Sequence, residues 1–238
     1  MISVRVPERL SERALVLAAD SPARGEGTAS TGAAEAPLEG RVLLGGPLAV
    51  VLTEEFVADD SELKAFVAQE AATAVYHLVH LGLTVTAPAG RPPLHSIDLR
   101  LELTAADGAA FQPVAWSLSP RHLVTGRTAE RTLSLGPSLK LLGAEVSVGS
   151  ASWTTSGADG RPWLRAVREL RSDPAWEFRR VSGAELEGEH RLAAVVRTPR
   201  GSATTLGLGV TAAVRRRTGL LRKYVQELVE PLQSAVDL

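Results

Sequence analysis

One segment of the sequence, residues 96–104, constrains the fold more than any other. It reads SIDLRLELT, in which Ile97, Leu99, Leu101 and Leu103 alternate with polar residues. A period of two places the apolar side chains on one face of a β-strand and the polar side chains on the other. This alternation is typical of an antiparallel sheet that packs one face on a core and turns the other to solvent. The chain is therefore expected to fold around antiparallel strands.

Further strand patterns recur along the chain at regular spacing. Residues 41–58 predict two strands joined by a Gly-Gly-Pro turn, and strands are also expected at 73–86, 114–118, 132–135 and 139–148. Residues 190–198 and 202–214 flank a Pro-Arg-Gly turn and predict a long β-hairpin. Short strands separated by turns favour a sandwich or a barrel. The predicted fold class is mainly β, with an antiparallel β-sandwich or a partly closed barrel.

Two internal helices are predicted as well. Leu63, Phe66, Val67 and Ala71 fall at helical spacing after Ser61, which predicts a short helix at 61–72 with Ser61 as its N-cap. Residues 73–81 fit either a helix or a strand, and their density of Val and Thr favours the strand. A second short helix is expected after Pro162, since Trp163, Val167 and Leu170 share a helical face.

The C-terminal segment, residues 218–238, predicts an amphipathic helix. Its apolar residues form a stripe at helical spacing, interrupted by Pro231: Leu221, Tyr224, Val225, Leu228, Val229, Leu232 and Ala235. The predicted organisation is a single β-rich domain at 1–217 followed by this helix. Residues 21–40 contain a single Leu among Gly, Ala, Ser, Thr, Pro and Glu, and predict a flexible loop inside the domain.

Composition narrows the setting of the protein. There is no cysteine, which excludes disulfides, thiol catalysis and thiolate zinc sites. No run of eighteen apolar residues occurs, and charges at Glu8 and Arg9 interrupt the N-terminal apolar stretches, so the cytoplasm is the expected compartment. Arginine outnumbers lysine 23 to 3, which suggests a GC-rich bacterial genome. Residues 1–119 carry a net charge of −7 and residues 120–238 carry +6, so the molecule has two electrically different halves.

No familiar catalytic or cofactor motif is present. His77 and His80 would lie on opposite faces of a strand, which argues against a shared metal ion. Glu185, Glu187 and Glu189 precede His190 and would share a face in an extended segment, a pattern more typical of a solvated strand edge than of an active site. We predict no catalytic residue, no metal site and no cofactor.

Two groups of residues are candidates for binding. Trp176 and Phe178 are the aromatic residues expected to line a small-ligand pocket, if one exists. The predicted partner-binding residues are those on the C-terminal stripe: Leu221, Tyr224, Val225, Leu228 and Leu232. Arg215, Arg216 and Arg217 precede the stripe and offer a weak possibility of contact with a membrane surface, and no nucleic acid is expected as a partner.

Three hypotheses for function follow from these patterns. The first is a non-catalytic protein-interaction or scaffold module of a bacterial cytoplasmic assembly, which binds a protein through a sheet edge or the terminal helix. The alternative is a small-ligand or lipid-binding β-domain that uses the interior of the fold. The third is an enzyme with an unrecognised site around Glu185, Glu187, Glu189 and His190.

Overall fold

The computed structural model describes residues 12–14, 42–58, 60–86, 93–124, 133–134, 140–141, 162–184, 186–218, 222–227 and 232–238. These residues contain one α-helix and fourteen β-strands. In chain order the elements are β1 (Glu12–Ala14), β2 (Val42–Val51), α1 (Ser61–Glu70), β3 (Ala74–Val85), β4 (Leu94–Ala105), β5 (Val114–Ser119), β6 (His122–Val124), β7 (Leu133–Ser134), β8 (Lys140–Leu141), β9 (Pro162–Val167), β10 (Ala175–Arg179), β11 (Gly188–Pro199), β12 (Thr204–Thr218), β13 (Arg222–Glu227) and β14 (Leu232–Asp237).

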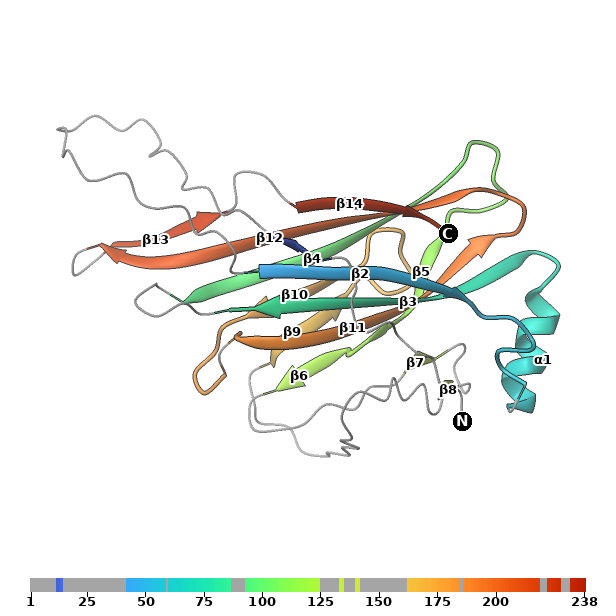
Figure 1. Cartoon of the computed structure of the whole chain (residues 1–238), viewed down its shortest axis with the longest axis horizontal. Coiled ribbons are helices and arrows are strands. Elements are labelled where there is room, and N and C mark those ends of the chain that lie inside the picture. Colours follow the sequence, from blue (N-terminus) through green and yellow to red (C-terminus); the bar gives the residue numbers. More distant parts are fainter. Residues whose placement is uncertain are drawn as a thin grey trace.

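Most of these strands form two antiparallel sheets. Sheet A has the order β1-β2-β3-β11-β5, and sheet B has the order β13-β12-β4-β10-β9-β6, with β14 also paired to β12. A small third sheet contains β7 and β8. The long strands follow the long axis of the molecule, and α1 lies at one end of it (Figure 1). The two stacked antiparallel sheets confirm the predicted β-rich sandwich, and neither closes into a barrel.

The main core lies between the two sheets. Ile97, Leu99, Leu101 and Leu103 of β4 are at most 3% exposed, while Arg100, Glu102 and Thr104 between them are exposed. They pack with Val79, Leu81, Leu83 and Val85 of β3 and with apolar residues from β10, β11 and β12. The alternation at 96–104 is thus confirmed as a strand with one buried face. Residues 73–81 are also confirmed as strand, because β3 covers Ala74–Val85.

A second, smaller core lies on the outer face of sheet A. Tyr76 and Leu78 of β3 point away from the main core and pack with Leu63 and Val67 of α1 and with Val195 of β11. Burial on both faces explains why the middle of β3 lacks a polar face. The predicted helix at 61–72 is confirmed as α1. Among the described residues, no helix has the length and apolar composition needed to cross a membrane.

The N-cap of α1 is Asp60 rather than the predicted Ser61. The Asp60 side chain accepts hydrogen bonds from the backbone N–H groups of Glu62 and Leu63, at 3.1 and 3.0 Å. Asp60 has an extended backbone, as an N-cap residue requires, whereas Ser61 is already the first helical residue. Both residues are good caps by type, so only the backbone conformation distinguishes them.

The predicted β-hairpin of residues 190–198 and 202–214 is wrong in its pairing. Both segments are strands, but β11 pairs with β3 and β5 in sheet A, whereas β12 pairs with β4, β13 and β14 in sheet B. The turn at Arg200 and Gly201 therefore carries the chain from one sheet to the other. Alternation identifies a strand with one buried face, but it does not identify the neighbour to which the strand bonds.

The predicted C-terminal amphipathic helix is also wrong. Residues 222–227 and 232–237 are the strands β13 and β14, both antiparallel to β12. β14 pairs with Thr205–Val210 and β13 pairs with Ala213–Thr218, so the returning chain follows the full edge of β12. Pro231 lies between the two strands, where a helix could not continue. Pairing with an open sheet edge satisfies this backbone better than an isolated, proline-interrupted helix would.

Two local predictions need similar correction. Residues 162–167 form β9 of sheet B, not a helix, because β9 lies between β10 and β6 and exchanges hydrogen bonds with both. The predicted Gly-Gly-Pro turn at 45–47 is a bulge within the continuous strand β2. Its register with β3 passes from Gly45↔Gly82 to Leu48↔His80, so β2 has one extra residue there. The loop predicted at 21–40 lies outside the described residues.

Candidate binding site

Arg197 occupies the centre of a polar and aromatic cluster on the outer face of sheet A. It lies on β11 between Tyr76 of β3 and Val114 of β5, its register partners on either side. Its side chain is 22% exposed. We call this group, which consists of Phe66, Glu70, Tyr76, Phe111, Trp116 and Arg197, the Arg197 cluster. It draws on α1, β3, β5, β11 and the loop before β5.

Aromatic rings surround the guanidinium group of Arg197. Its Cζ atom lies 4.2 Å from the ring centroid of Phe111 and 5.8 Å from that of Trp116, both within the range of a cation–π interaction. Tyr76 contacts Trp116 edge to face at 5.9 Å between ring centroids and contacts Phe66 at 5.4 Å. Phe66, Phe111 and Trp116 are each half-buried. The rings therefore hold the arginine in a defined position at the molecular surface.

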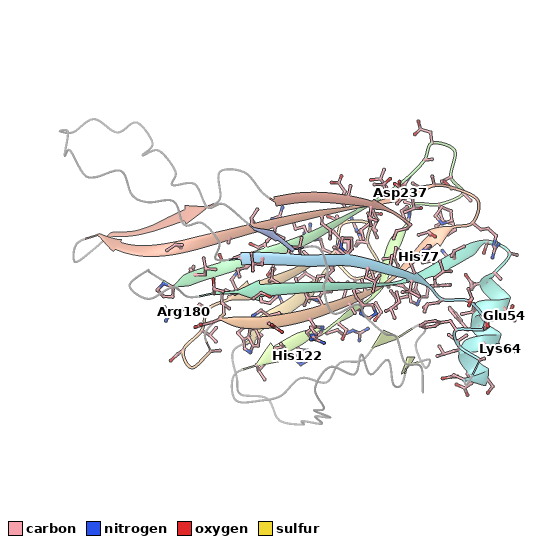
Figure 2. All side chains as sticks on the ribbon, viewed as in Figure 1. Glu54, Lys64, His77, His122, Arg180 and Asp237 are labelled. Atoms are coloured by element: carbon pink, nitrogen blue, oxygen red, sulfur yellow. The ribbon has the colours of Figure 1, made fainter. Side chains whose placement is uncertain are left out.

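A single carboxylate pairs with this arginine. Nη2 of Arg197 donates a hydrogen bond to Oε2 of Glu70 at 3.0 Å, and the Glu70 side chain is 30% exposed. Glu70 is the last residue of α1, so this ion pair fastens the end of the helix to sheet A. The helix lies at one end of the molecule, where Figure 2 labels Glu54 and Lys64.

Two polar atoms of the cluster are buried without a hydrogen bond in the described part of the chain. They are the Tyr76 hydroxyl and Nε of Arg197. Burial raises the pKa of Tyr76 to about 12, although the positive charge of Arg197 opposes the shift. The phenol is therefore neutral at physiological pH. Arg197 and Glu70 both interact with the Tyr76 hydroxyl, so Nε of Arg197 is the atom of this cluster that lacks any polar neighbour among the described residues. A buried donor without a partner is costly, and it points to a ligand group that this site could accommodate.

Sequence reasoning missed this cluster because its geometry depends on a bulge. On β11, Val195 and Val196 are consecutive, but they face Ser117 and Ala115 of β5, so Trp116 is the extra residue. In the regular strand predicted at 114–118, Trp116 and Leu118 would share one face, because they are two positions apart. In the structure Leu118 belongs to the main core, whereas Trp116 packs against the outer cluster. Bulges commonly redirect a side chain in this way.

The structure places Trp176 and Phe178, the predicted ligand-lining residues, inside the main core. Both belong to β10 and both are 0% exposed. The indole Nε1 of Trp176 donates to the backbone carbonyl of Pro120 at 3.2 Å, so its polar atom is satisfied within the protein. Their observed role is to fill the space between the sheets. A contact with a ligand stays a prediction.

The structure brings Phe178 together with His190, a residue of the hypothetical enzyme site. The His190 ring lies 5.2 Å from that of Phe178 and 5.5 Å from that of Trp163, and its Nε2 lies 2.9 Å from the carbonyl oxygen of Leu186. Glu187 and Glu189 are exposed, whereas Glu185 lies outside the described residues. The imidazole is thus held by aromatic packing and a backbone carbonyl, an arrangement that stabilises the start of β11.

The predicted partner-binding residues lie in the C-terminal part of the chain. Tyr224 and Val225 belong to β13 and Leu232 begins β14, while Leu221 and Leu228 lie outside the described residues. Arg215, Arg216 and Arg217 belong to β12, opposite β13. The described part of this segment is formed by the strands β13 and β14 instead of the predicted helix. Their role in binding a partner stays a prediction.

Surface features elsewhere give less support to a binding site. A shallow hollow of about 510 Å³ lies on the outer face of sheet B and is lined by Glu102, Thr104, Ala105, Ala106, Ala203, Thr205 and Gly207. Glu102 is its one charged lining residue, and small side chains dominate the rest. Within the residues that the structure describes, no group of three His, Asp or Glu side chains could hold a metal ion.

Comparisons with known proteins do not change this description. No protein-family model matches the sequence, and no curated protein sequence matches it. Among solved structures, the chain is similar to the NetB toxin of Clostridium perfringens in its membrane-inserted form, with a TM-score of 0.32 and 7% sequence identity. The likeness covers 69% of this chain and 87% of the toxin chain. At that TM-score it carries no conclusion about fold or function.

Proposed function

We propose that this protein is a non-catalytic interaction module of a bacterial cytoplasmic assembly, and that it binds a partner protein through the Arg197 cluster. The observation that carries the proposal is an arginine held between Phe111 and Trp116 at the surface of sheet A. Arginine, tyrosine and tryptophan are the residue types that contribute most binding energy in protein interfaces. Their fixed geometry also lowers the entropy lost when a partner binds.

Binding of a partner strand along the edge of sheet A has less support at β5, which is the last strand of that sheet. The backbone N–H and carbonyl groups of Ala115 bond to Arg171 and Leu170, at 3.0 and 2.8 Å. The carboxylate of Glu169 accepts the N–H of Leu118 at 2.9 Å. The loop between β9 and β10 thereby occupies this edge, which is one way in which proteins prevent unwanted strand addition. The proposal therefore places the contact on the face of sheet A rather than on this edge.

A pair of aromatic substitutions tests the proposal. We expect Phe111→Ala to weaken binding of the partner by about 30-fold, the loss typical of an interface hot spot. The matched control is Trp163→Ala, which removes another half-buried aromatic side chain, from sheet B. The measurement is affinity purification from the native host with both variants and the unchanged chain, followed by titration of any stoichiometric partner.

The two variants separate a specific contact from a general loss of structure. If Phe111→Ala loses the partner while Trp163→Ala keeps it, and both variants unfold cooperatively on heating, the proposal is supported. If both variants keep the partner at unchanged affinity, the Arg197 cluster is not the contact. A failure of the unchanged chain to retain any protein would count against the interaction module itself.

A further inference from the structure

The ion pair between Arg197 and Glu70 uses only part of what the guanidinium group offers. A guanidinium has five N–H donors and can bind a carboxylate through two parallel hydrogen bonds. Here Glu70 accepts from Nη2, while Nε of Arg197 is buried without a partner in the part of the chain that the structure describes. The Nε and Nη2 donors of one guanidinium point along the same edge. A carboxylate that approached this edge could engage both donors.

Glu70 is also an electrostatically poor partner for this arginine. It is the last residue of α1, where the partial negative charge of the helix dipole repels a carboxylate. The last turn of α1 contains no basic residue that would offset this repulsion. A carboxylate supplied by another molecule is not attached to the last residue of α1 and can approach Arg197 from the solvent side. It would therefore compete well for Arg197.

The surroundings of Arg197 suit an exchange of carboxylates. The side chains of Arg197 and Glu70 are 22% and 30% exposed, so Glu70 can turn toward solvent without leaving a core. Phe111 and Trp116 would keep the guanidinium in position while this happens. The neutral Tyr76 hydroxyl lies beside the ion pair and interacts with both Arg197 and Glu70. The aromatic rings supply apolar contact for groups that flank an incoming carboxylate.

We propose that the Arg197 cluster is a carboxylate-binding site, and that Glu70 occupies it as an internal ligand which the carboxylate of a partner displaces. The partner's carboxylate can come from an Asp or Glu side chain or from a chain terminus. This inference rests on the proposed function in one respect, namely that the molecule which carries the carboxylate is a protein. The binding site itself can be tested without that partner.

The test uses three small probes and the full chain labelled with ¹⁵N. N-Acetylphenylalanine carries a terminal carboxylate, N-acetylglutamic acid α-amide carries a side-chain carboxylate, and N-acetylphenylalaninamide carries none. The readout is the NMR signal of the Arg197 Nε–H group, assigned by its loss in Arg197→Lys. We expect at least one carboxylate probe to shift this signal with saturation and the neutral amide to leave it in place. The stronger of the two carboxylates identifies the source.

The variant Glu70→Gln gives the decisive comparison. Removing the internal competitor should tighten binding of the carboxylate probe by about fivefold, the upper range for a partly exposed ion pair. If the ion pair only fastened α1, the same variant would lower stability and create no affinity. The inference is overturned if neither carboxylate shifts the signal in the unchanged chain and in Glu70→Gln, or if the amide binds equally well.

The outcomes also separate this inference from the proposed function. A captured partner that depends on Phe111 but binds Glu70→Gln and Arg197→Lys like the unchanged chain would support the interaction module and overturn the carboxylate site. Carboxylate probes that bind while no partner protein is captured would support the site and overturn the module.

Discussion

His77 and His80 are three positions apart on β3, so their side chains lie on opposite faces of the strand. His77 is 6% exposed, and its Nε2 lies 3.2 Å from the hydroxyl of Thr198. His80 is 5% exposed, and its Nε2 has no hydrogen bond among the described residues. Burial lowers the pKa of both imidazoles below the ordinary value of 6.5. Figure 2 shows His77 within the body of the molecule. Both residues are therefore held in the neutral form.

This burial predicts a loss of stability in mild acid. As the pH falls below 6.5, the unfolded chain takes up protons on both imidazoles before the folded chain does, which favours unfolding. The stability that the two neutral, buried imidazoles contribute is fully present above pH 6.5. It is lost as the pH falls toward the lower pKa values of the folded protein. Each unit of pKa difference is worth about 1.4 kcal/mol. Urea denaturation at pH 5, 6 and 7.5 measures the effect.

Two histidine variants serve as test and control. His80→Leu should reduce the pH dependence between pH 7.5 and 5, because it removes one of the two buried imidazoles. His122→Leu is the matched control, because it removes an exposed imidazole on β6. If the unchanged chain, His80→Leu and His122→Leu showed the same pH dependence of stability, the lowered pKa of His80 would not be its source.

At the scale of single residues, sequence reasoning succeeded where periodicity alone decides. The opposite faces of His77 and His80 follow from their odd spacing once β3 is a strand. Arg197 and Trp116 could not be paired in this way, because they are 81 positions apart and meet through a bulge that adds one residue to β5. Trp176 had two compatible roles by type, and only its complete burial between the sheets places it in the core.

At the scale of elements, the start of α1 offers a test of capping. Asp60→Ala removes the acceptor for the N–H groups of Glu62 and Leu63 and should lower the free energy of unfolding by about 1 kcal/mol. Ser61→Ala is the matched control and should change it by less than about 0.5 kcal/mol, because Ser61 is exposed and does not cap the helix. Urea denaturation distinguishes the two. A larger effect of Ser61→Ala would show that the cap is misassigned.

The edge of sheet B gives a second test at this scale. Val236 and Leu238 pack against the main core, and the N–H of Leu238 bonds to the carbonyl of Thr204 at 2.8 Å. Deleting residues 232–238 should uncover the edge of β12 and cause self-association. Denaturation and size-exclusion chromatography at several concentrations measure the outcome. A monomer of unchanged stability would contradict the pairing of β14 with β12.

The C-terminal segment shows how a pattern can fit two kinds of element. Its apolar residues match a helical stripe, yet Tyr224 and Val225 are adjacent β-forming residues and belong to β13. The long strand β12 provides an edge along its whole length, and the returning chain pairs with both halves of it. A helical moment describes the segment alone, whereas the open edge is a property of the surrounding fold.

At the scale of the whole molecule, the class of fold could be predicted but its connections could not. Alternation in β4 and in both predicted hairpin strands was sufficient to predict an antiparallel β-sandwich or a partly closed barrel. The partners of those strands follow from where the chain crosses between sheets. The connections β3–β4, β4–β5, β5–β6, β10–β11 and β11–β12 all make this crossing. Turns between strands look alike in sequence whether they join neighbours or opposite sheets.

Because the chain crosses between the sheets so often, the sheet neighbours of some strands are synthesised much later than the strands themselves. The two sheet neighbours of β4 are β10 and β12, and the nearer of them begins at Ala175, 70 positions after β4 ends at Ala105. A nascent chain thus contains β4 for several seconds before either neighbour has been synthesised, at about 5–20 residues per second. During that interval its five core-facing side chains have no sheet to join. Chaperone demand in the cell should therefore be greatest midway through synthesis.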